Sequence, residues 1–403
     1  MEPRKGRALE SPILRLPSEK FLTVPLRGAE ASTSRRVKSG DRVQRFATLS
    51  DPLGGMPIRA PSVGIVQEIK EIQHPLLGEV YGAVLELDGK RGAEKRMSGA
   101  MPSGDEIIEI ARDAGIVDEF DGVPLYKKLK RIRRLKMDFL FLNGVDDESY
   151  VSSALAVLKE SSDEVLEGFR LAAAACGIQD LGIAVPESRT VHNFPVFQKE
   201  TDISVHWIKP VYPGIQILMN QVRKQGKQPV ALGVQCCLAL KQAVNTGIPQ
   251  TSTVITLAEA ETGKTKNIRV LVGTPVRSVL QFSGWKLPPI GFVMGSPMTG
   301  GYTEDRDTPV VPETRCILLI SQAKKETGDC IGCGKCALVC PNEIWPWYLY
   351  RQMKRSSYLD AVGLPRAERC CGCNACAAVC PAGLPLGKAV RQAAEIKEGD
   401  GYQ

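Results

Sequence analysis

The sequence predicts a multidomain protein of mixed α and β structure, and three observations support this prediction. The chain has 403 residues, more than one ordinary core needs, because single domains usually hold about 100 to 200 residues. Between residues 19 and 322, short strands give way to helices that alternate with strands, and then to strands again. Nine of the 13 cysteines lie between Cys330 and Cys380, whereas the first 175 residues contain none. We therefore expect three folded regions followed by a cysteine-rich module.

The first folded region, expected at residues 19–95 after an N-terminal extension at 1–18, has a pattern of short strands. Thr23–Leu26 is typical of a strand, and Val37–Val43 predicts a strand, a Gly-Asp turn and a return strand. Ile58–Val66 repeats this arrangement. The pattern resembles the barrel-sandwich hybrid of biotinyl and lipoyl carrier domains, but the carrier lysine between two methionines is missing. We therefore expect a structural β domain.

The second region, expected at residues 100–250, combines helical and strand periodicity. Ser103 and Glu106 have the spacing of a capping box at the start of an amphipathic helix. The other expected elements are a buried strand at Phe139–Asn143, one or two helices within 150–176 that break near Ser161–Asp163, and a strand at Leu181–Pro186. Helices that alternate with apolar strands favour a parallel sheet covered by helices.

The third region, expected at residues 251–322, returns to strand patterning. Its apolar runs are Thr253–Leu257, Ile268–Val272, Gly291–Gly295 and Cys316–Ile320, with Gly and Pro between them. The cysteine-rich module is expected at 323–388 and a C-terminal tail at 389–403.

The composition indicates the cellular compartment in which we expect the protein. The chain is 43% hydrophobic and 24% charged, and no apolar stretch reaches the roughly 18 residues that a membrane-spanning helix needs. The basic N-terminus lacks the apolar core and cleavage site of a signal peptide. Disulfide frameworks spread along a chain, so the clustered cysteines favour metal binding in a reducing compartment. We expect a cytoplasmic protein, with peripheral association at the inner face of the membrane as the alternative.

The formal net charge is +7, and the densest run of basic residues lies within 127–136. Its members are Lys127, Lys128, Lys130, Arg131, Arg133, Arg134 and Lys136. No aromatic residues alternate with these side chains, as they would in a groove that stacks bases, so we expect no nucleic-acid partner. We interpret the run as a solvated surface, with docking of an acidic redox partner as the alternative.

The cysteine-rich module contains the spacing C-x2-C-x2-C-x3-C-P twice, once at Cys330–Pro341 and once at Cys370–Pro381. Bacterial ferredoxins with two 4Fe-4S clusters have this spacing, and the fourth cysteine of each motif binds the other cluster. The expected ligands are Cys330, Cys333, Cys336 and Cys380 for cluster 1, and Cys370, Cys373, Cys376 and Cys340 for cluster 2. Glycines 332, 334 and 372 would let backbone amides approach the clusters. Zinc is the alternative, but a zinc site needs neither the third cysteine nor the duplication.

Five cysteines lie outside this ligand set. Cys371 directly follows an expected ligand, and we expect it not to bind a cluster, with replacement of Cys370 as the alternative. The other four, which lie in apolar sequence, are Cys176, Cys236, Cys237 and Cys316. Apolar surroundings favour buried, inert thiols. A redox or metal site at the adjacent Cys236 and Cys237 is the alternative.

Four aromatic residues lie between the two cysteine motifs. They are Trp345, Trp347, Tyr348 and Tyr350. We expect them to pack over the clusters, with contact to a partner protein as the alternative.

The order of the regions resembles one family over about residues 16–387. The segments that carry the resemblance are Val37–Val43, Ala60–Val66, Ala114–Val117, Asn143–Gly144, Tyr212–Gly214, Val272–Val276 and Gly295–Met298. In this order they resemble the C subunit of the Rnf electron-transport complex and its soluble relatives, including the cobalamin reductase of propanediol microcompartments. The resemblance implies a barrel-sandwich hybrid domain, an α/β domain related to the flavin subunit of complex I, a β-grasp domain and a two-cluster ferredoxin-like domain.

The resemblance also implies a flavin site, but the sequence departs from the family pattern there. In the family, Ala114–Val117 would lead into a glycine-rich loop, GxGGAxFPT, which cradles FMN and admits NADH. Here Asp118–Pro124 follows instead and keeps one glycine, Gly122. Fixed acidic residues are the opposite of what a phosphate-binding loop needs.

A second departure follows Asn143–Gly144, where the family has an acidic-Cys-acidic-Pro segment. This chain has Val145–Ser149, in which Asp147 or Glu148 would keep a family carboxylate. The degenerate cofactor site therefore lies near Gly115, Gly122, Lys128 and Asn143. We expect FMN and NADH binding to be lost, with FMN bound by an altered loop as the alternative.

Together these expectations favour an iron-sulfur electron-transfer subunit without catalytic residues of its own. Its two clusters would relay single electrons between a flavoprotein or ferredoxin and a partner oxidoreductase in a multi-subunit complex. The alternative is an FMN-dependent NADH dehydrogenase module of an Rnf-type or soluble reductase complex. A third interpretation gives the clusters a purely structural role.

Overall fold

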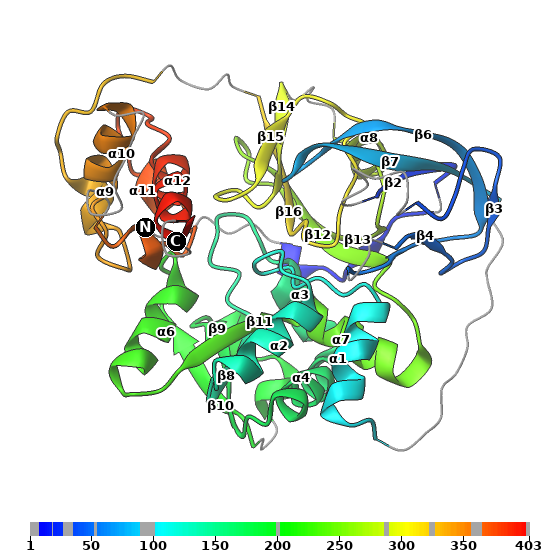
Figure 1. The fold of residues 1–403 in the computed structure, drawn as a ribbon, viewed down its shortest axis with the longest axis horizontal. Coiled ribbons are helices and arrows are strands. Elements are labelled where there is room, and N and C mark those ends of the chain that lie inside the picture. Colours follow the sequence, from blue (N-terminus) through cyan, green and yellow to red (C-terminus); the bar gives the residue numbers. More distant parts are fainter. Residues whose placement is uncertain are drawn as a thin grey trace.

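The computed structural model describes residues 8–17, 19–26, 35–51, 55–88, 101–198, 202–285, 290–321, 327–355 and 365–399. Figure 1 shows three bodies: strand-rich structure at the upper right, helices around a sheet below it, and the cysteine-rich module at the upper left. Residues 1–7 and 18 of the expected N-terminal extension lie outside the described residues.

In its described residues, the first β domain has six strands and a small apolar core. They are β2 (Phe21–Pro25), β3 (Arg42–Val43), β4 (Thr48–Ser50), β5 (Ile58–Arg59), β6 (Gly64–His74) and β7 (Gly78–Leu87). Four form an antiparallel sheet in the order β2-β7-β6-β3, and β4 pairs with β5. The strand expected before the Gly-Asp turn is not formed. The Lys38 amide instead donates to the Asp41 side chain at 2.9 Å, and only Arg42 and Val43 pair with β6.

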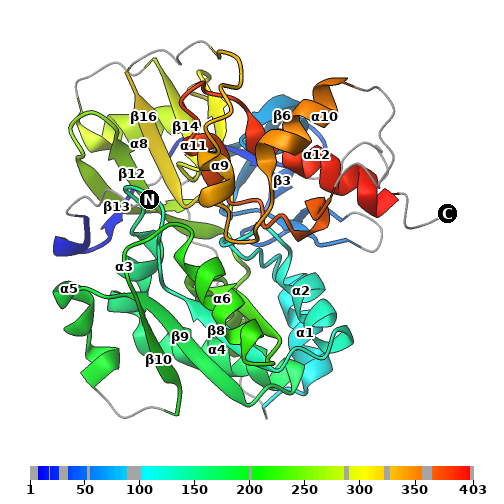
Figure 2. The ribbon, with the colours of Figure 1, turned by 90° about the vertical axis from the view of Figure 1, so that its left-hand side faces the viewer.

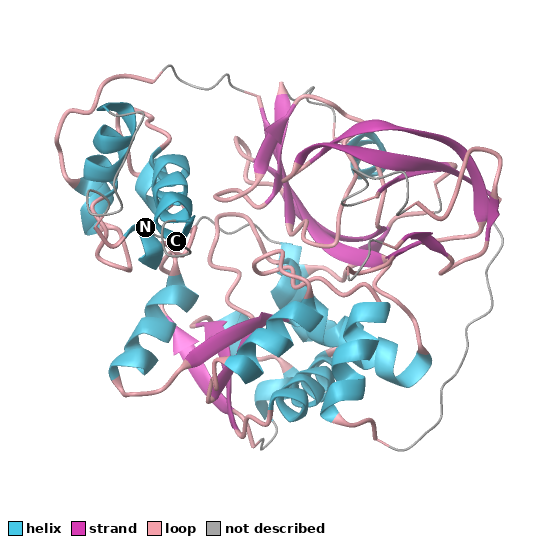
Figure 3. Ribbon diagram, viewed as in Figure 1, coloured by secondary structure: helices cyan, strands magenta, loops and turns pink. Residues whose placement is uncertain are grey.

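The α/β domain contains a four-stranded parallel sheet, as the sequence predicts. Its elements are α1 (Gly104–Asp113), α2 (Leu125–Arg134), β8 (Phe139–Asn143), α3 (Ser153–Glu160), α4 (Ser162–Cys176), β9 (Asp180–Pro186), α5 (Arg189–His192), a 3-10 turn (Pro195–Gln198), β10 (Ser204–Ile208), α6 (Gly214–Lys224), β11 (Pro229–Gly233) and α7 (Val234–Thr246). The strand order is β10-β9-β8-β11, and all neighbours are parallel. Figure 3 shows helices packed around this sheet. The predicted capping box at Ser103 and Glu106 and the helix break at Ser161 are confirmed.

Both faces of the parallel sheet are buried, which explains the apolar character of β8. Leu140 and Leu142 join the large core formed with α4 and α7, whereas Phe141 packs on the opposite face with Ile215 and Met219. Gly168 of α4 packs directly on α7: a Cβ there would lie 1.9 Å from the Cys237 carbonyl oxygen. A larger residue would force the two helices apart.

The strand order creates a switch point between β8 and β11. The chain passes from β8 to β9 and β10 on one side, and then returns to place β11 on the other side of β8. In open parallel sheets, ligands bind in the crevice outside the carboxyl ends of the strands at such a point. The residues that follow β8 and β11 therefore define the place to look for a site.

The third region has the strand order of a β-grasp fold. Its elements are β12 (Ser252–Glu259), β13 (Thr265–Leu271), α8 (Val276–Ser283), β14 (Gly291–Gly295), β15 (Gly301–Thr303) and β16 (Cys316–Ile320). The sheet order is β1-β13-β12-β16-β14-β15, with β16 parallel to β12 between the two hairpins. The added edge strand β1 (Leu14–Arg15), which follows a 3-10 turn at Ala8–Glu10, pairs in parallel with β13.

The cysteine-rich module is a pair of short helix-loop units closed by longer helices. It contains α9 (Lys335–Leu338), α10 (Pro346–Arg355), a 3-10 turn (Ala367–Arg369), α11 (Ala375–Ala378) and α12 (Leu386–Gly399). Figure 2 shows α9 and α11 near one another, with α10 and α12 beside them. Leu349, Val390 and Ala393 form the small apolar core between the two longer helices.

Within the described part of the chain, no helix combines the length and apolar character needed to cross a membrane.

Candidate functional site

The eight predicted cluster cysteines gather into two groups, each lining its own small cavity. Cage 1 is lined by Cys330, Cys333, Cys336 and Cys380, and cage 2 by Cys340, Cys370, Cys373 and Cys376, with Cys371 also in the wall of cage 2. Each cage thus takes three cysteines from one motif and the fourth from the other, which is the arrangement predicted from the spacing. Four thiols around one cavity fit the thiolate ligation of a 4Fe-4S cluster, so the residues present suit this cofactor.

The backbone of the two motifs explains which residues stand between the cysteines. Gly332 and Gly372 have φ values of 71° and 70°, and Gly334 has 72°. Asn374, at the position equivalent to Gly334, has φ of 60°, in the left-handed region that asparagine tolerates better than most residues. The left-handed turns bend each loop around its cage, so the chain needs glycine or asparagine there.

Cage 2 faces the rest of the protein, and hydrogen bonds made by Tyr212, Asn220 and Asn374 hold it there. The Tyr212 hydroxyl, next to the cis Tyr212–Pro213 bond, donates to the Cys373 carbonyl oxygen. The Asn220 amide on α6 donates to the Pro341 carbonyl oxygen at 2.9 Å. The Asn374 side chain donates to the Met298 carbonyl oxygen at 2.8 Å. The α/β domain and the loop after β14 thus both position the second cysteine motif.

A central cavity of about 780 Å³ lies between these parts of the molecule. It is lined by the loop before α2, by α2 and α6, by residues that follow β8 and β14, and by Cys371, Gly372 and Cys373. Its volume lies in the range of roughly 300 to 1,000 Å³ typical of cofactor pockets. The cavity therefore joins the switch point of the sheet to the loop of cage 2.

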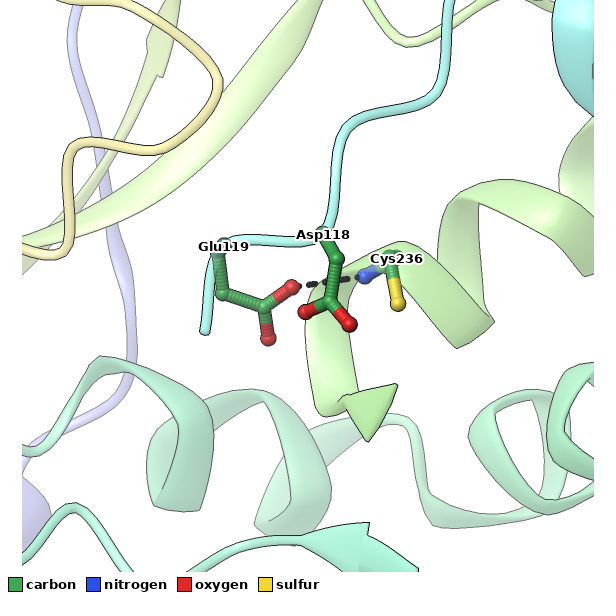
Figure 4. A group of neighbouring side chains, drawn as sticks. All are labelled: Asp118, Glu119 and Cys236. Carbon is green, nitrogen blue, oxygen red and sulfur yellow. Dashed lines mark hydrogen bonds between the residues drawn. The ribbon is translucent and has the colours of Figure 1, made fainter. Parts of the chain in front are cut away.

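Two acidic side chains of the altered loop occupy the switch point itself. Glu119 accepts hydrogen bonds from the backbone amides of Gln235 (2.7 Å) and Cys236 (3.0 Å) in the first turn of α7, and Asp118 accepts one from the Gly233 amide at 3.0 Å. Figure 4 shows the Glu119 carboxylate directed at the Cys236 nitrogen, with Asp118 beside it. The amino terminus of a helix attracts anions, and here the protein supplies its own carboxylates.

The space at this helix end is also filled. A Cβ at Gly233 would lie 2.3 Å from Glu119 Cδ, so the glutamate packs directly against the backbone where β11 becomes α7. Burial, followed by the neighbouring Asp118 carboxylate, raises the pKa of Glu119 to about 8. The Glu119 side chain therefore fills the space at the head of α7.

Lys128 is buried at this site, so its interpretation as part of a solvated surface is wrong. Its ammonium group contacts Asp118 Oδ2 at 2.5 Å and Asp121 Oδ2 at 2.6 Å, and its side chain is only 8% exposed. Burial alone would lower the pKa of Lys128, but the carboxylates of Asp118 and Asp121 raise it. Lys127, Lys130 and Arg131 on the same helix are exposed, as expected.

Asp118, Glu119 and Cys236 each place one potential metal ligand atom within 4.8 Å of the others. The carboxylates already accept three backbone hydrogen bonds at α7, and the Lys128 ammonium group contacts Asp118 directly. A cation would have to displace these donors and approach an existing positive charge. The group is therefore better described as an internal ion-pair cluster than as a metal site.

The acidic segment after β8 also binds protein groups. Glu148 accepts hydrogen bonds from the Ser296 hydroxyl and the Met298 amide, both at 2.8 Å, and its Oε1 lies 2.5 Å from the guanidinium of Arg315. Asp147 accepts a hydrogen bond at 3.4 Å from the Ile215 amide in the first turn of α6. Glu148 thereby fixes the loop whose Met298 carbonyl holds cage 2, and Asp147 contacts the helix that carries Asn220.

The four residues predicted near the degenerate flavin site do not all meet. Gly122 and Lys128 line the central cavity. Gly115 lines a separate small cavity with Pro57 and is not among the residues that line the central cavity. Asn143 is buried at the end of β8, where its side chain accepts a hydrogen bond from the Val145 amide at 3.2 Å.

The remaining cysteines and aromatic residues follow the predictions in part. Cys236, Cys237 and Cys316 are buried. Burial raises the pKa of Cys236 and Cys237, and it raises the pKa of Cys176 to about 12, so these three thiols stay protonated. Trp347 lines cage 1 as expected, but Trp345 is 60% exposed. Sequence reasoning missed the contacts of Glu148 with Arg315 and of Glu119 with α7, because nothing in the local sequence signals partners 167 and 116 residues away.

Comparisons with known families match three parts of the chain in order. Residues 1–90 match the RnfC barrel sandwich hybrid domain, 111–248 the Nuo51 FMN-binding domain and 329–384 a 4Fe-4S dicluster domain. The predicted fold class, with its barrel-sandwich, flavin-subunit-like α/β and ferredoxin-like parts, is thereby confirmed. The chain thus contains a domain for two 4Fe-4S clusters.

Two curated relatives illustrate the similarity. The C subunit of the proton-translocating ferredoxin:NAD(+) oxidoreductase complex of Clostridium ljungdahlii is 27% identical over 355 residues, which span 82% of this chain and 78% of that protein. The C subunit of the ion-translocating oxidoreductase complex of Pectobacterium carotovorum is 28% identical over 378 residues, which span 86% of this chain but only 50% of that protein. A solved NAD+-reducing [NiFe]-hydrogenase in the H2-reduced state aligns with a TM-score of 0.48 and 14% identity, over 73% of this chain and 63% of that chain.

The fold matches a flavin-binding domain, but the residues at its switch point do not suit a flavin phosphate. The cavity has a suitable size. However, Asp118 and Glu119 occupy the amino terminus of α7, and Lys128 is already paired with two carboxylates. The residues present therefore do not fit a flavin phosphate at the head of α7. The order of the three matched domains, together with the two curated relatives, supports the similarity of this chain to the RnfC-like family.

Proposed function

We propose that the chain is an electron-transfer subunit of an oxidoreductase complex, which relays single electrons through two 4Fe-4S clusters. The observation that carries the proposal is the different exposure of the two cages. Cys371, Gly372 and Cys373 line both cage 2 and the central cavity, whereas Ile331 and Cys333 of cage 1 are exposed at the surface. A relay needs two such openings, one toward each partner.

The assignment of ligands follows from the cages. Cys330, Cys333, Cys336 and Cys380 would hold cluster 1, and Cys370, Cys373, Cys376 and Cys340 would hold cluster 2. When bound, each cluster can accept and release one electron. The protein's own contribution is to fix the cysteine-rich module against the α/β domain and the loop after β14, through Tyr212, Asn220 and Asn374.

The same proposal names the partners and the location. Its donors and acceptors are redox proteins, such as a flavoprotein, a ferredoxin or another subunit, since this chain's cavity offers no fitting flavin phosphate site among the residues described. We place the protein in the cytoplasm, where a complex with membrane subunits would bring it to the inner face of the membrane. The curated relatives, which are subunits of ion-translocating complexes, support this placement.

A reductive titration tests the proposal. The anaerobically purified protein should take up about two electrons per chain from dithionite, one for each 4Fe-4S cluster, with electron paramagnetic resonance signals of two interacting centres. A protein that binds about eight iron atoms but accepts no electrons would limit the clusters to a structural role.

The second candidate is an FMN-dependent NADH dehydrogenase module. The match of residues 111–248 to the Nuo51 FMN-binding domain and the cofactor-sized cavity favour it. Bound flavin that is bleached by NADH would decide for this candidate, since a relay without flavin has no group that accepts a hydride.

A further inference from the structure

The mouth of the central cavity carries positive charge that the described part of the chain does not neutralise. Lys127 and Arg131 on α2, Arg223 on α6 and Arg391 on α12 all line the cavity and are exposed. Among the described residues, none of the four is within ion-pair distance of a carboxylate, and Arg223 donates to the Asn220 side chain at 2.7 Å.

Four of the five acidic residues of the same cavity are bonded within the protein. Glu119 accepts the amides of α7, Asp121 contacts Lys128, Asp147 accepts the Ile215 amide and Glu148 contacts Arg315. The fifth, Glu313, is buried. Lys128 and Arg315, two buried cations, are paired with these acids. The charge left for an incoming partner is therefore the exposed set on the three helices, and it is positive.

This positive set lies beside cage 2. Arg223 is close enough to Cys371, and Arg391 to Cys370, for a charge interaction. Between the cations, Ile215, Met219 and Val230 give the cavity wall an apolar character. An apolar centre with a charged rim next to a redox loop has the composition of a protein docking site.

The arrangement also distinguishes a protein from a small anion. A phosphate group would need converging donors, and the head of α7, which offers them, is filled by Glu119. The exposed cations are instead spread over α2, α6 and α12, as long side chains that reach a broad surface. Charges spread in this way match an acidic protein face better than a single phosphate.

From this geometry we infer that the cavity mouth, formed by Lys127, Arg131, Arg223 and Arg391, docks an acidic electron-carrier protein against the cage 2 loop. The inference rests on the proposed relay function, and it adds the site and the charge of one partner. Cage 2 is then the end of the relay that meets a mobile carrier, while cage 1 faces the remaining subunits. In this complex, carboxylates around the carrier's own centre would meet the four cations.

Two triple variants with the same net charge test the inference. The cavity variant is R131E/R223E/R391E, and the control is R134E/K224E/K388E, which changes exposed residues on the same three helices that do not line the cavity. Binding of an oxidised ferredoxin with two 4Fe-4S clusters and net negative charge is measured by calorimetry at low and at high salt. We expect the dissociation constant to rise about tenfold or more in the cavity variant at low salt, and less than about twofold in the control.

Equal effects in both triple variants would overturn the inference, because they would show only a dependence on net charge. No effect in either variant, or no binding of ferredoxin by the unaltered protein, would overturn it as well. If either triple variant loses iron, the single pair R223E and K224E replaces it and is compared in the same way. Binding is measured without electron transfer, so the relay function can fail, as seen in the dithionite titration, independently of this result.

Discussion

The cysteine-rich module and the switch-point crevice come from the same family pattern, but they differ in what they leave open. In the module, each of two small cavities is lined by the four cysteines predicted to hold one 4Fe-4S cluster, and the second cavity is also lined by Cys371. In the crevice, Asp118 and Glu119 fill the head of α7, and Lys128 is bonded to two carboxylates. The module therefore has the residues to bind a cofactor, whereas at the crevice the amino terminus of α7 is occupied by the protein's own acidic side chains.

The comparison shows that a fold can be retained although the residues of its cofactor site have changed. The parallel sheet, the switch point and a cavity of about 780 Å³ are all present. Asp118 and Glu119, which replace glycines of the family pattern, accept hydrogen bonds from backbone amides at α7 that would otherwise be available to an anionic ligand. The segment after β8 has likewise become a structural element, because Glu148 holds the loop against which cage 2 packs. Function therefore has to be argued from these contacts and not from the fold.

The largest expected effect comes from opening one cage. Cys333→Ala removes one of the four cage 1 thiols, so iron should fall from about eight to about four atoms per chain, and electron transfer through the module should stop. The first 320 residues have their own cores and should stay folded. Iron analysis and circular dichroism measure both outcomes.

Cys371→Ala is the matched control for this change. Cys371 borders cage 2 but lies outside both predicted ligand sets, so the variant should keep about eight iron atoms. A loss of iron in this control would mean that Cys371, and not Cys370, is the ligand. Normal electron transfer in Cys333→Ala would contradict the relay.

The next largest effect tests the closed crevice. Lys128→Met leaves the fully buried Asp118 without its cation, which should lower the free energy of unfolding by about 3 to 5 kcal/mol. The same change at the neighbouring, exposed Lys127 should alter it by no more than about 0.5 kcal/mol. Chemical denaturation of the two variants, followed by circular dichroism, measures the difference. Equal stability of both variants would show that the ion pair of Lys128 with Asp118 does not stabilise the fold.

Glu148→Ala tests the converted segment after β8. The change leaves Arg315 buried without its carboxylate, so we expect a loss of about 3 to 5 kcal/mol and a looser contact between the β14 loop and cage 2. Asp202→Ala breaks an exposed pair with Arg170 and should cost less than about 1 kcal/mol. Hydrogen exchange at residues 296–300 and 371–376 should rise in the first variant only; unchanged exchange there would remove Glu148 from the docking of the module.

A smaller effect is expected from removing Glu119, which tests whether an anion can then bind at the amino terminus of α7. Glu119→Ala frees two backbone amides of α7, and the lost cap should lower stability by about 1 to 2 kcal/mol. Inorganic phosphate should then raise the melting temperature of the variant, but not that of the unaltered protein, relative to chloride at the same ionic strength. The same phosphate response in both proteins would mean that Glu119 does not block the site.

The smallest effect is a pH dependence. The pKa of Glu119 is raised from 4.5 to about 8, so between these values the folded state holds a proton that the unfolded state has lost. The free energy of unfolding should therefore fall as the pH rises through this window. Glu119→Gln cannot titrate, and its melting temperature should fall less steeply between pH 6 and pH 8 than that of the unaltered protein. If the melting temperatures of both proteins fall equally steeply with pH, the group that ionises in this range is not Glu119.

The sequence predicted those parts of the molecule that depend on local spacing. The two cysteine motifs, the strand at Phe139–Asn143 and the capping box at Ser103 each involve residues near one another in the chain, so period and spacing reveal them. The acidic loop at Asp118–Asp121 was recognised as a departure from the family pattern, but its partners were not. Lys128 had the local composition of a surface residue, and only the tertiary structure brings Asp118 and α7 around it.

The most direct test of the account is the cofactor content of the anaerobically purified protein. Iron, acid-labile sulfide and acid-released flavin are quantified per chain, and the visible spectrum is followed during addition of NADH. The account predicts about eight iron and eight sulfide atoms, no flavin, and a spectrum that NADH does not change. One FMN per chain and bleaching by NADH would contradict it, because the crevice that Glu119 and Lys128 close would then have to hold a flavin.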